Sequence, residues 1–223
     1  YGSFEVYRSV EEKNPGIRNT LVVGPWAHGG WARSGGDHLG SAYFGSNTAD
    51  FYREQIELPF FKHHLKDGPD PKLPEAYVFE TGSNQWRKYD HWPPAASKEK
   101  RLFLASGGGL HFERQDGGSE FDQYVSDPAH PVPYTETITP GMTREYMTDD
   151  QRFASRRPDV LVYQTDVLKT DVTLTGTQLA DFWISTSGSD CDLVVKLIDR
   201  FPDNAANHKY TPPLSSMGGQ QMM

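Results

Sequence analysis

The sequence predicts an α/β segment followed by an all-β sandwich or jelly roll, and three observations support this order. Near the start of the chain a helical pattern precedes an apolar run without polar alternation, as in a strand buried on both faces of a parallel sheet. After residue 95, no convincing helical stripe recurs, and short strand-like runs alternate with turn clusters. Gly (21 residues) and Pro (16 residues) exceed their usual joint share of roughly 12%, which favours turns and short strands.

The first elements of the α/β segment are a helix and a strand. Phe4, Tyr7 and Val10 recur at helical spacing, which predicts a helix over residues 1–13 that ends at an Asn-Pro-Gly sequence. The run TLVV at residues 20–23 then predicts a buried strand, and a helix followed by such a strand is typical of α/β folds. The Gly-rich residues 26–46 predict a long irregular loop at the carboxyl end of this strand.

A second helix and a second strand complete the α/β segment. Asn47 is a candidate cap for the helix, Pro59 predicts a kink or restart, and Gly68 is a candidate C-terminal cap. Its apolar stripe consists of Tyr52, Ile56, Phe60, Phe61 and Leu65. Residues 76–80 predict a strand, and the prolines within residues 90–94 predict a domain boundary. We therefore expect one domain over residues 1–95 and a second over residues 96–223.

The second domain is expected to consist of strands. Turn clusters separate its apolar runs, while residues 112–158 are polar, contain prolines and have no clear assignment. The predicted strands lie at residues 101–105, 160–165, 171–175, 180–185 and 193–199.

Composition excludes several classes of function. The chain carries 22 basic and 30 acidic residues, a net charge of −8, and no cluster of Lys and Arg, which argues against a nucleic-acid surface. No apolar run of the roughly 18 residues needed to span a membrane is present. Cys191 is the single cysteine, which excludes cysteine-based zinc sites and an internal disulfide. We expect no nucleic-acid or membrane partner, while the cellular compartment stays open.

The most informative stretch is GPWAHGGW at residues 24–31. His28 lies just beyond the predicted buried strand, and functional groups in open α/β sheets gather at this edge. A histidine there has the placement that a general base needs. The spacing by itself favours the alternative, a histidine that only packs or forms hydrogen bonds in the loop. Trp26 and Trp31 flank it and are candidates for lining a substrate pocket or for packing.

This stretch resembles the catalytic-histidine loop of the family of α/β hydrolases that includes cocaine esterases, α-amino acid ester hydrolases, glutaryl-cephalosporin acylases and X-Pro dipeptidyl-peptidases. Further likenesses follow in order along nearly the whole chain. YVFETG at 77–82, WR at 86–87 and WPP at 92–94 resemble the closing strand of the hydrolase domain. RLFL at 101–104 and SDPAHPVP at 126–133 resemble the start of a C-terminal jelly roll of the galactose-binding-like type. DQRF at 150–153, RPDVL at 157–161, QT at 164–165, SDCD at 189–192 and VVKLID at 194–199 are similar to ester hydrolases and acylases in particular.

The resemblance implies acyl transfer to water through a Ser-His-Asp triad, with His28 as the base and a small ester or amide as substrate. In α/β hydrolases the triad order along the chain is Ser, Asp, His, so both partners of His28 are expected upstream. No Gly-x-Ser-x-Gly occurs in these residues, and Asp37 is rejected as the acid because it follows His28. We therefore expect a C-terminal portion of an α/β hydrolase with a truncated jelly roll, inactive alone, that pairs with the upstream part of the protein and associates into homo-oligomers.

Two alternatives stay open. The first alternative hypothesis is another enzyme, an X-Pro dipeptidyl-peptidase. The second is a protein without catalytic activity, a β-sandwich that binds carbohydrate. Neither a metal site nor a cofactor is predicted: the adjacent His63 and His64 point to different sides of a helix, and no twelve-residue loop with a glycine supports calcium at the aspartates near residue 190.

Overall fold

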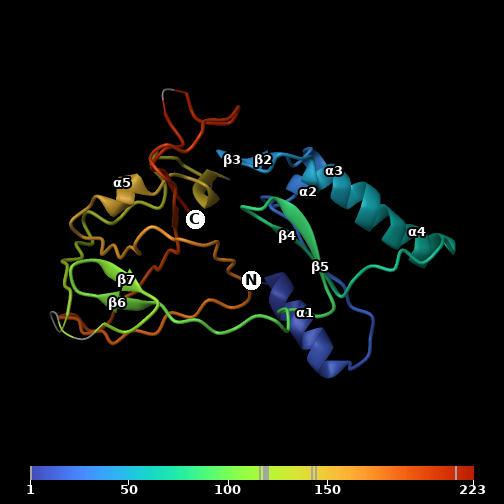
Figure 1. Cartoon of the computed structure of the whole chain (residues 1–223), viewed down its shortest axis with the longest axis horizontal. Helices are drawn as coiled ribbons and strands as arrows, with labels where there is room; N and C mark the ends of the chain where they lie inside the picture. The colour runs from blue at the N-terminus through green and yellow to red at the C-terminus, as the bar shows by residue number, and fades with distance from the viewer. Residues whose placement is uncertain (1, 116, 118–120, 142, 144, 214) are drawn as a thin grey trace. The chain divides into compact units, whose positions relative to one another are not determined.

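A computed structural model describes the chain except residues 1, 116, 118–120, 142, 144 and 214 (Figure 1). The backbone forms two compact units. One comprises residues 1–96 with 208–210, and the other comprises residues 97–207 with 211–223. Among the described residues, no helix is both long enough and apolar enough to cross a membrane.

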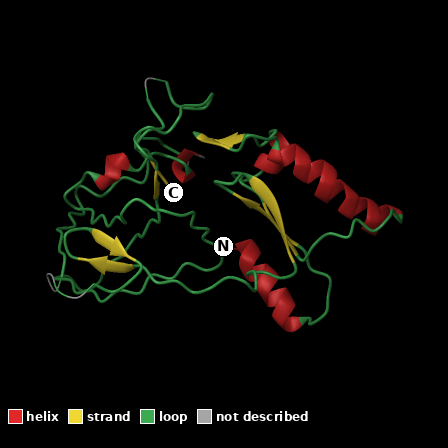
Figure 2. Ribbon diagram, viewed as in Figure 1, coloured by secondary structure: helices red, strands yellow, loops and turns green. Residues whose placement is uncertain are grey.

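The first unit is built on a three-stranded mixed sheet. Strands β1 (Leu21–Val23) and β4 (Ala76–Glu80) pair in parallel, and β5 (Gln85–Tyr89) pairs antiparallel with β4 (Figure 2). The strand predicted at 20–23 is present as a parallel strand over residues 21–23, but only Leu21 is buried and the two valines are half-buried, so the expected burial of the whole run is not seen. The strand at 76–80 is confirmed over the same residues. Three strands alone do not identify a hydrolase domain, so the structure shows an α/β arrangement and no more.

Helices cover both faces of this sheet. Helix α1 (Gly2–Lys13), which confirms the predicted N-terminal helix, buries Tyr7 against Leu21 and Ala76. On the other face Tyr77 meets Phe51 edge-on, with ring centroids 6.0 Å apart. Neighbouring residues of a strand point to opposite faces of the sheet. Ala76 contacts α1 and the next residue, Tyr77, contacts Phe51, so α1 and the helix containing Phe51 lie on opposite faces. The sheet is therefore enclosed between two helical layers.

The second helical layer is one continuous helix with an irregular centre. It comprises α3 (Thr48–Tyr52), a π-helical stretch η1 (Arg53–Glu57) and α4 (Leu58–Lys66). The widened turn lies just before Pro59, which has no N–H and crowds the preceding turn, so the irregularity expected at this proline is present as a π-helical stretch, and the helix does not end and restart there. At the C-terminal end of α4, Asp67 has a left-handed backbone conformation (φ 51°), and the Gly68 N–H donates to the Lys62 carbonyl at 3.0 Å. The predicted cap is thus displaced by one residue.

The stretch predicted as a long irregular loop contains regular structure. It holds the one-turn helix α2 (Gly30–Arg33) and a small hairpin of β2 (His38–Leu39) and β3 (Ala42–Tyr43). Local backbone bonds close these elements, so the prediction of an unstructured loop was wrong in this respect.

The second unit contains short paired segments. Strands β6 (Phe103–Ala105) and β7 (Gly109–His111) form a hairpin, and β8 (Asp199–Arg200) pairs with β9 (Gln221–Met222). A 3₁₀ turn, η2 (Glu145–Met147), and the one-turn helix α5 (Arg152–Ser155) lie between them in the chain. Buried Gln151, Met217 and Gln220 contribute to the interior of this unit.

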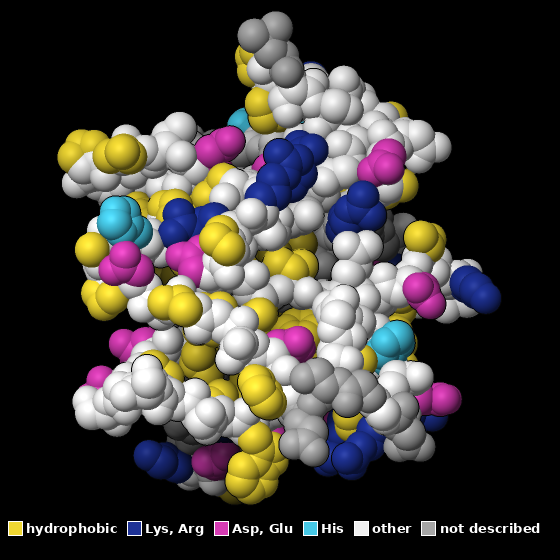
Figure 3. Space-filling model, turned by 90° about the vertical axis from the view of Figure 1, so that its left-hand side faces the viewer, with side chains coloured by type: hydrophobic (Ala, Val, Ile, Leu, Met, Phe, Trp, Pro, Cys, Tyr) yellow, Lys and Arg dark blue, Asp and Glu magenta, His cyan; other side chains and the backbone are white. Residues whose placement is uncertain are grey.

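The predicted strands of the second unit are only partly present. Of the predicted strand at 101–105, residues 103–105 form β6, and residues 160–165 contribute one bridge, between Gln164 and Gly109. Residues 171–175 and 180–185 form no strand, and only Asp199 of the last run does. These runs have strand-forming side chains but lack paired neighbours, and a strand exists through its inter-strand hydrogen bonds. Large apolar side chains therefore stay exposed, including Trp183 at 103% and Val194 at 85%. Apolar side chains are visible at the surface in Figure 3.

Candidate functional site

His28 lies in a tight turn beyond the carboxyl end of β1. The Gly30 N–H donates to the Ala27 carbonyl at 2.8 Å and closes the turn. Ala27 is buried while His28 is exposed, so the backbone is fixed and the imidazole is accessible. The ring has an edge contact with Trp31, at a centroid distance of 6.0 Å and an angle of 80°. An accessible imidazole on a fixed backbone is compatible with a general base, which must come within hydrogen-bond reach of the proton that it removes.

Trp26 anchors the chain before His28. Its indole N–H donates to the Thr48 hydroxyl at 2.8 Å, and its ring lies 5.2 Å from Tyr52 and 6.0 Å from Trp86. A Cβ at Gly24 would lie 2.2 Å from the indole ring, so only glycine leaves room for it there. These contacts describe a packed anchor between the loop and helix α3.

Arg53 anchors the chain after His28. Its guanidinium donates to the carbonyls of Trp31 and Ser34, the latter at 3.0 Å, and pairs with Asp50. The carbonyls at the end of a one-turn helix have no partner within the helix, and a cation there offsets their partial negative charge. The continuous helix that begins at Thr48 therefore holds both sides of the histidine turn.

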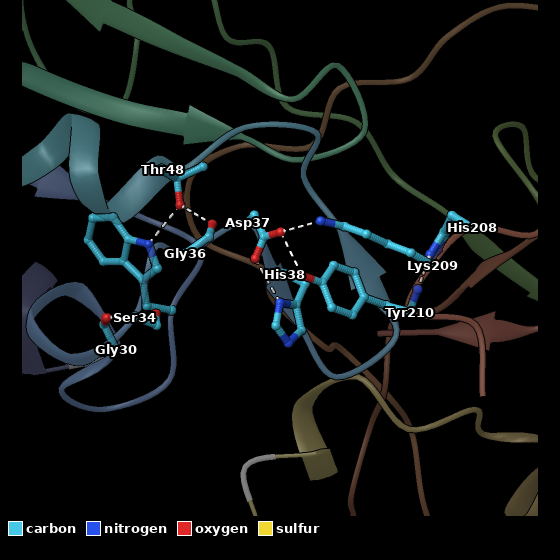
Figure 4. Close-up of polar contacts among 10 residues, drawn as sticks. Gly30, Ser34, Gly36, Asp37, His38, Thr48, His208, Lys209 and Tyr210 are labelled. Carbon is cyan, nitrogen blue, oxygen red and sulfur yellow. Dashed lines mark hydrogen bonds and ion pairs between the residues drawn. The ribbon is translucent and has the colours of Figure 1, made fainter. Parts of the chain in front are cut away.

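Gly36, in the loop after α2, contacts Thr48, the residue that also binds Trp26. The Thr48 hydroxyl donates to the Gly36 carbonyl at 2.5 Å, as Figure 4 shows, and Thr48 is fully buried. Thr48 thus accepts from Trp26 and donates to Gly36, so one hydroxyl joins two parts of the loop. Gly36 has a left-handed backbone with φ 73°.

We expect Gly36→Ala to destabilise the chain more than Gly45→Ala. Both glycines have φ 73°, so both variants incur the left-handed strain of about 1–2 kcal/mol. At Gly36 the new Cβ would also lie 2.7 Å from the Thr48 hydroxyl and from the Trp26 indole nitrogen, whereas at Gly45 nothing lies within 4 Å. The crowding should cost about 1–3 kcal/mol more. Urea unfolding of both variants measures the difference, and equal losses would contradict the packed anchor.

Asp37 is engaged by groups other than His28. Its carboxylate accepts from Lys209 Nζ at 2.7 Å and from the Tyr210 hydroxyl at 2.6 Å, and His38 Nδ1 lies 2.9 Å away (Figure 4). The hydrogen bonds from Lys209, then Tyr210 and then His38 hold the pKa of this carboxyl well below its usual range. Asp37 is therefore a charged acceptor already committed to these donors.

The remaining candidates do not assemble into a site. His63 and His64 have ring centroids 4.8 Å apart, and His63 Nδ1 lies 2.9 Å from the Gly68 carbonyl at the helix end. Across the described ranges, no group of three or more His, Cys, Asp or Glu residues could hold a metal ion.

Sequence reasoning missed four residues that hold the loop: Thr48, Arg53, Lys209 and Tyr210. Thr48 and Arg53 belong to a helix that the pattern predicts, but no spacing shows which loop they contact. Lys209 and Tyr210 are separated from Asp37 by 172 and 173 positions, and only the folded chain brings them together.

Comparisons with known proteins agree with one another. The family described as "X-Pro dipeptidyl-peptidase C-terminal non-catalytic domain" matches residues 71–222. The chain is 32% identical over 198 residues to cocaine esterase of Rhodococcus sp. (strain MB1 Bresler), across 83% of this chain and 34% of that protein. A crystal structure of an aminopeptidase from the marine sediment archaeon Thaumarchaeota archaeon matches 99% of this chain at 35% identity with a TM-score of 0.81, and the chain covers 36% of it. The chain thus spans about a third of each relative, and His28 precedes the segment that the family describes.

Proposed function

Because the chain belongs to the X-Pro dipeptidyl-peptidase C-terminal domain family, we propose that it is the C-terminal part of a serine hydrolase in which His28 is the general base. The observation that carries this proposal is the anchored, exposed histidine at the carboxyl end of a parallel strand. The nucleophilic serine and the acid of the triad would come from a segment outside these residues.

The chemistry proposed is acyl transfer to water in two steps. His28 takes the proton of the serine hydroxyl as the oxygen attacks the acyl carbon, and it then donates that proton to the leaving group. In the second step His28 takes a proton from the water that attacks the acyl carbon, and it donates that proton to the serine oxygen as the acyl–serine bond breaks, which releases the acid and regenerates the serine hydroxyl. The names of both relatives, an esterase and an aminopeptidase, describe hydrolysis of acyl bonds. No cofactor is needed for these steps.

The residues around His28 receive distinct roles in this proposal. Trp31 contacts the His28 ring and is assigned to the substrate side of the loop. Trp26 donates its N–H to buried Thr48 and packs on Tyr52, so we assign it to positioning the loop, although it was also a candidate for the pocket.

We also propose a fold for each of the two units. The first unit would be the histidine-bearing corner of an α/β hydrolase domain, and the second would be the jelly roll. Support comes from the parallel pairing of β1 with β4 and from the likeness to the archaeal aminopeptidase, which covers the extended runs of the second unit as well. In a jelly roll, the exposed apolar runs would have paired neighbours and a buried face.

We expect the intact enzyme to prefer esters or amides of small acyl groups over Xaa-Pro substrates. The motive is the closer likeness of residues 150–165 and 189–199 to ester hydrolases and acylases. Turnover of amino-acid esters, glutaryl amides and Xaa-Pro anilides is compared under one set of conditions. A higher kcat/KM for the anilides would refute the preference and favour the X-Pro dipeptidyl-peptidase, while His28-dependent turnover of any of the three would support acyl transfer.

A further inference from the structure

A short segment from late in the chain belongs to the first unit. Residues 208–210 are grouped with residues 1–96, and they lie beside the hairpin of β2 and β3. The Tyr210 ring stacks on His38 at a centroid distance of 3.6 Å and an angle of 15°, and His208 lies 5.5 Å from the Tyr43 ring. The segment is therefore attached by aromatic contacts as well as by polar ones.

Asp37 is the polar centre of this attachment. Lys209 Nζ and the Tyr210 hydroxyl reach the same carboxylate oxygen, at 2.7 and 2.6 Å, while His38 Nδ1 faces the other oxygen. Hydrogen bonds with an ionised partner are stronger than neutral ones and fix geometry more tightly. Lys209 Nζ also lies 4.7 Å from the centroid of the Tyr210 ring and 5.2 Å from that of Tyr43. These contacts hold the carboxylate of Asp37 in one orientation.

Asp37 lies next to the hydrogen bonds that anchor the loop carrying His28. The carbonyl of Gly36, next to Asp37 in the chain, accepts from Thr48, and Thr48 accepts from the Trp26 indole. Figure 4 shows the Thr48 bonds beside the bonds of Asp37. The Asp37 carbonyl in turn accepts from the Phe44 N–H at 2.9 Å, which closes the hairpin on the other side. A continuous series of contacts therefore joins Asp37 to Gly36, Thr48 and Trp26.

We propose that Lys209 and Tyr210 form a latch that fixes Asp37 and, through Thr48 and Trp26, the turn that carries His28. Asp37 is then a positioning residue, because the described contacts of its carboxylate are with Lys209, Tyr210 and His38 rather than with the His28 ring. The catalytic part of this inference rests on the proposed function, whereas the latch itself is a property of the chain. Misplacement of a catalytic group by about 1 Å is enough to lower a rate by about 100-fold.

The first test follows the Trp26 indole N–H in the 223-residue chain by NMR. We expect its hydrogen exchange to become about tenfold faster in Asp37→Asn, Lys209→Met and Tyr210→Phe, because the Thr48 partner is less firmly held. Lys209→Arg keeps a cationic donor and should stay close to the wild type. Exposed Lys98 and Tyr124 provide the matched controls Lys98→Met and Tyr124→Phe. Unchanged exchange in all three latch variants would overturn the latch.

The second test measures steady-state kinetics in the longer protein that contains this chain. Tyr210→Phe, which keeps the ring stacked on His38, and Lys209→Met should lower kcat about tenfold and leave KM within about twofold, with Lys209→Arg restoring kcat. Faster indole exchange with an unchanged kcat would overturn the positioning role. Normal turnover by His28→Ala in the same protein would instead refute the proposed function, while the exchange measurement would still decide the latch.

Discussion

Replacing His28 with alanine in the intact enzyme is expected to lower kcat by about four orders of magnitude. The imidazole would remove the proton from the serine and return it to the leaving group, and alanine has no group that can do either. The members of a triad act as a unit, so the loss of one removes most of the rate enhancement that depends on the covalent step. KM should change little, because His28 acts on the reacting atoms rather than on the remainder of the substrate.

The matched control for this variant is His64→Ala, which removes an exposed histidine on α4. It should leave kcat and KM close to the wild-type values. Circular dichroism and urea unfolding of both variants show whether the fold is preserved. Near-normal turnover by a folded His28→Ala protein would show that His28 is not the base, and the proposed mechanism would fail with it.

The second large effect is expected in the 223-residue chain by itself, which should show no esterase or amidase turnover. The chain contains no Gly-x-Ser-x-Gly sequence, and a histidine without a nucleophile cannot form an acyl-enzyme. Without the acid of the triad, the orientation and the protonated nitrogen of the imidazole are also not fixed. Co-expression with the segment that carries the serine and the acid should restore turnover, and the same co-expression with His28→Ala should not.

The isolated chain is also expected to associate. Its apolar runs over residues 171–198 expose large side chains such as Leu179, Trp183 and Val194, and the structure assigns no strand to these residues. Unpaired edges and exposed apolar surface favour pairing with another copy. Light scattering should therefore report a species heavier than 25.1 kDa. A monomeric chain with His28-dependent turnover would contradict both expectations and place the nucleophile within these residues.

Local sequence signals predicted the long helices of the first unit and its strands β1 and β4, but not α2, β2, β3 or β5. The helical spacing of Phe4, Tyr7 and Val10 and the apolar run before Gly24 each correspond to an observed element. These signals are local, because the spacing of apolar residues within a short stretch is enough to indicate a helix or a strand. Gly68 was predicted as the cap at the end of α4, but Asp67 takes the left-handed conformation instead. Aspartate is one of the few residues besides glycine that adopt this conformation.

The strands of the second unit show the limit of the same reasoning. Strand-forming side chains at residues 171–175 and 180–185 predict strands, yet neither run is paired in the structure. A helix satisfies its own backbone bonds, whereas a strand depends on a partner elsewhere in the chain or outside it. Strand propensity therefore indicates where pairing is favourable, and it cannot supply the neighbour.

The sequence by itself determined the place of His28 after an apolar parallel strand and, through its motifs, the family of hydrolases to which the chain belongs. Only the tertiary structure decided what holds that histidine turn. Thr48 and Arg53 reach it from a helix, and Lys209 and Tyr210 reach Asp37 across more than 170 positions of the chain. The physical reason is that a hydrogen bond or an aromatic contact depends on distance in space, which the spacing of residues along the chain does not record.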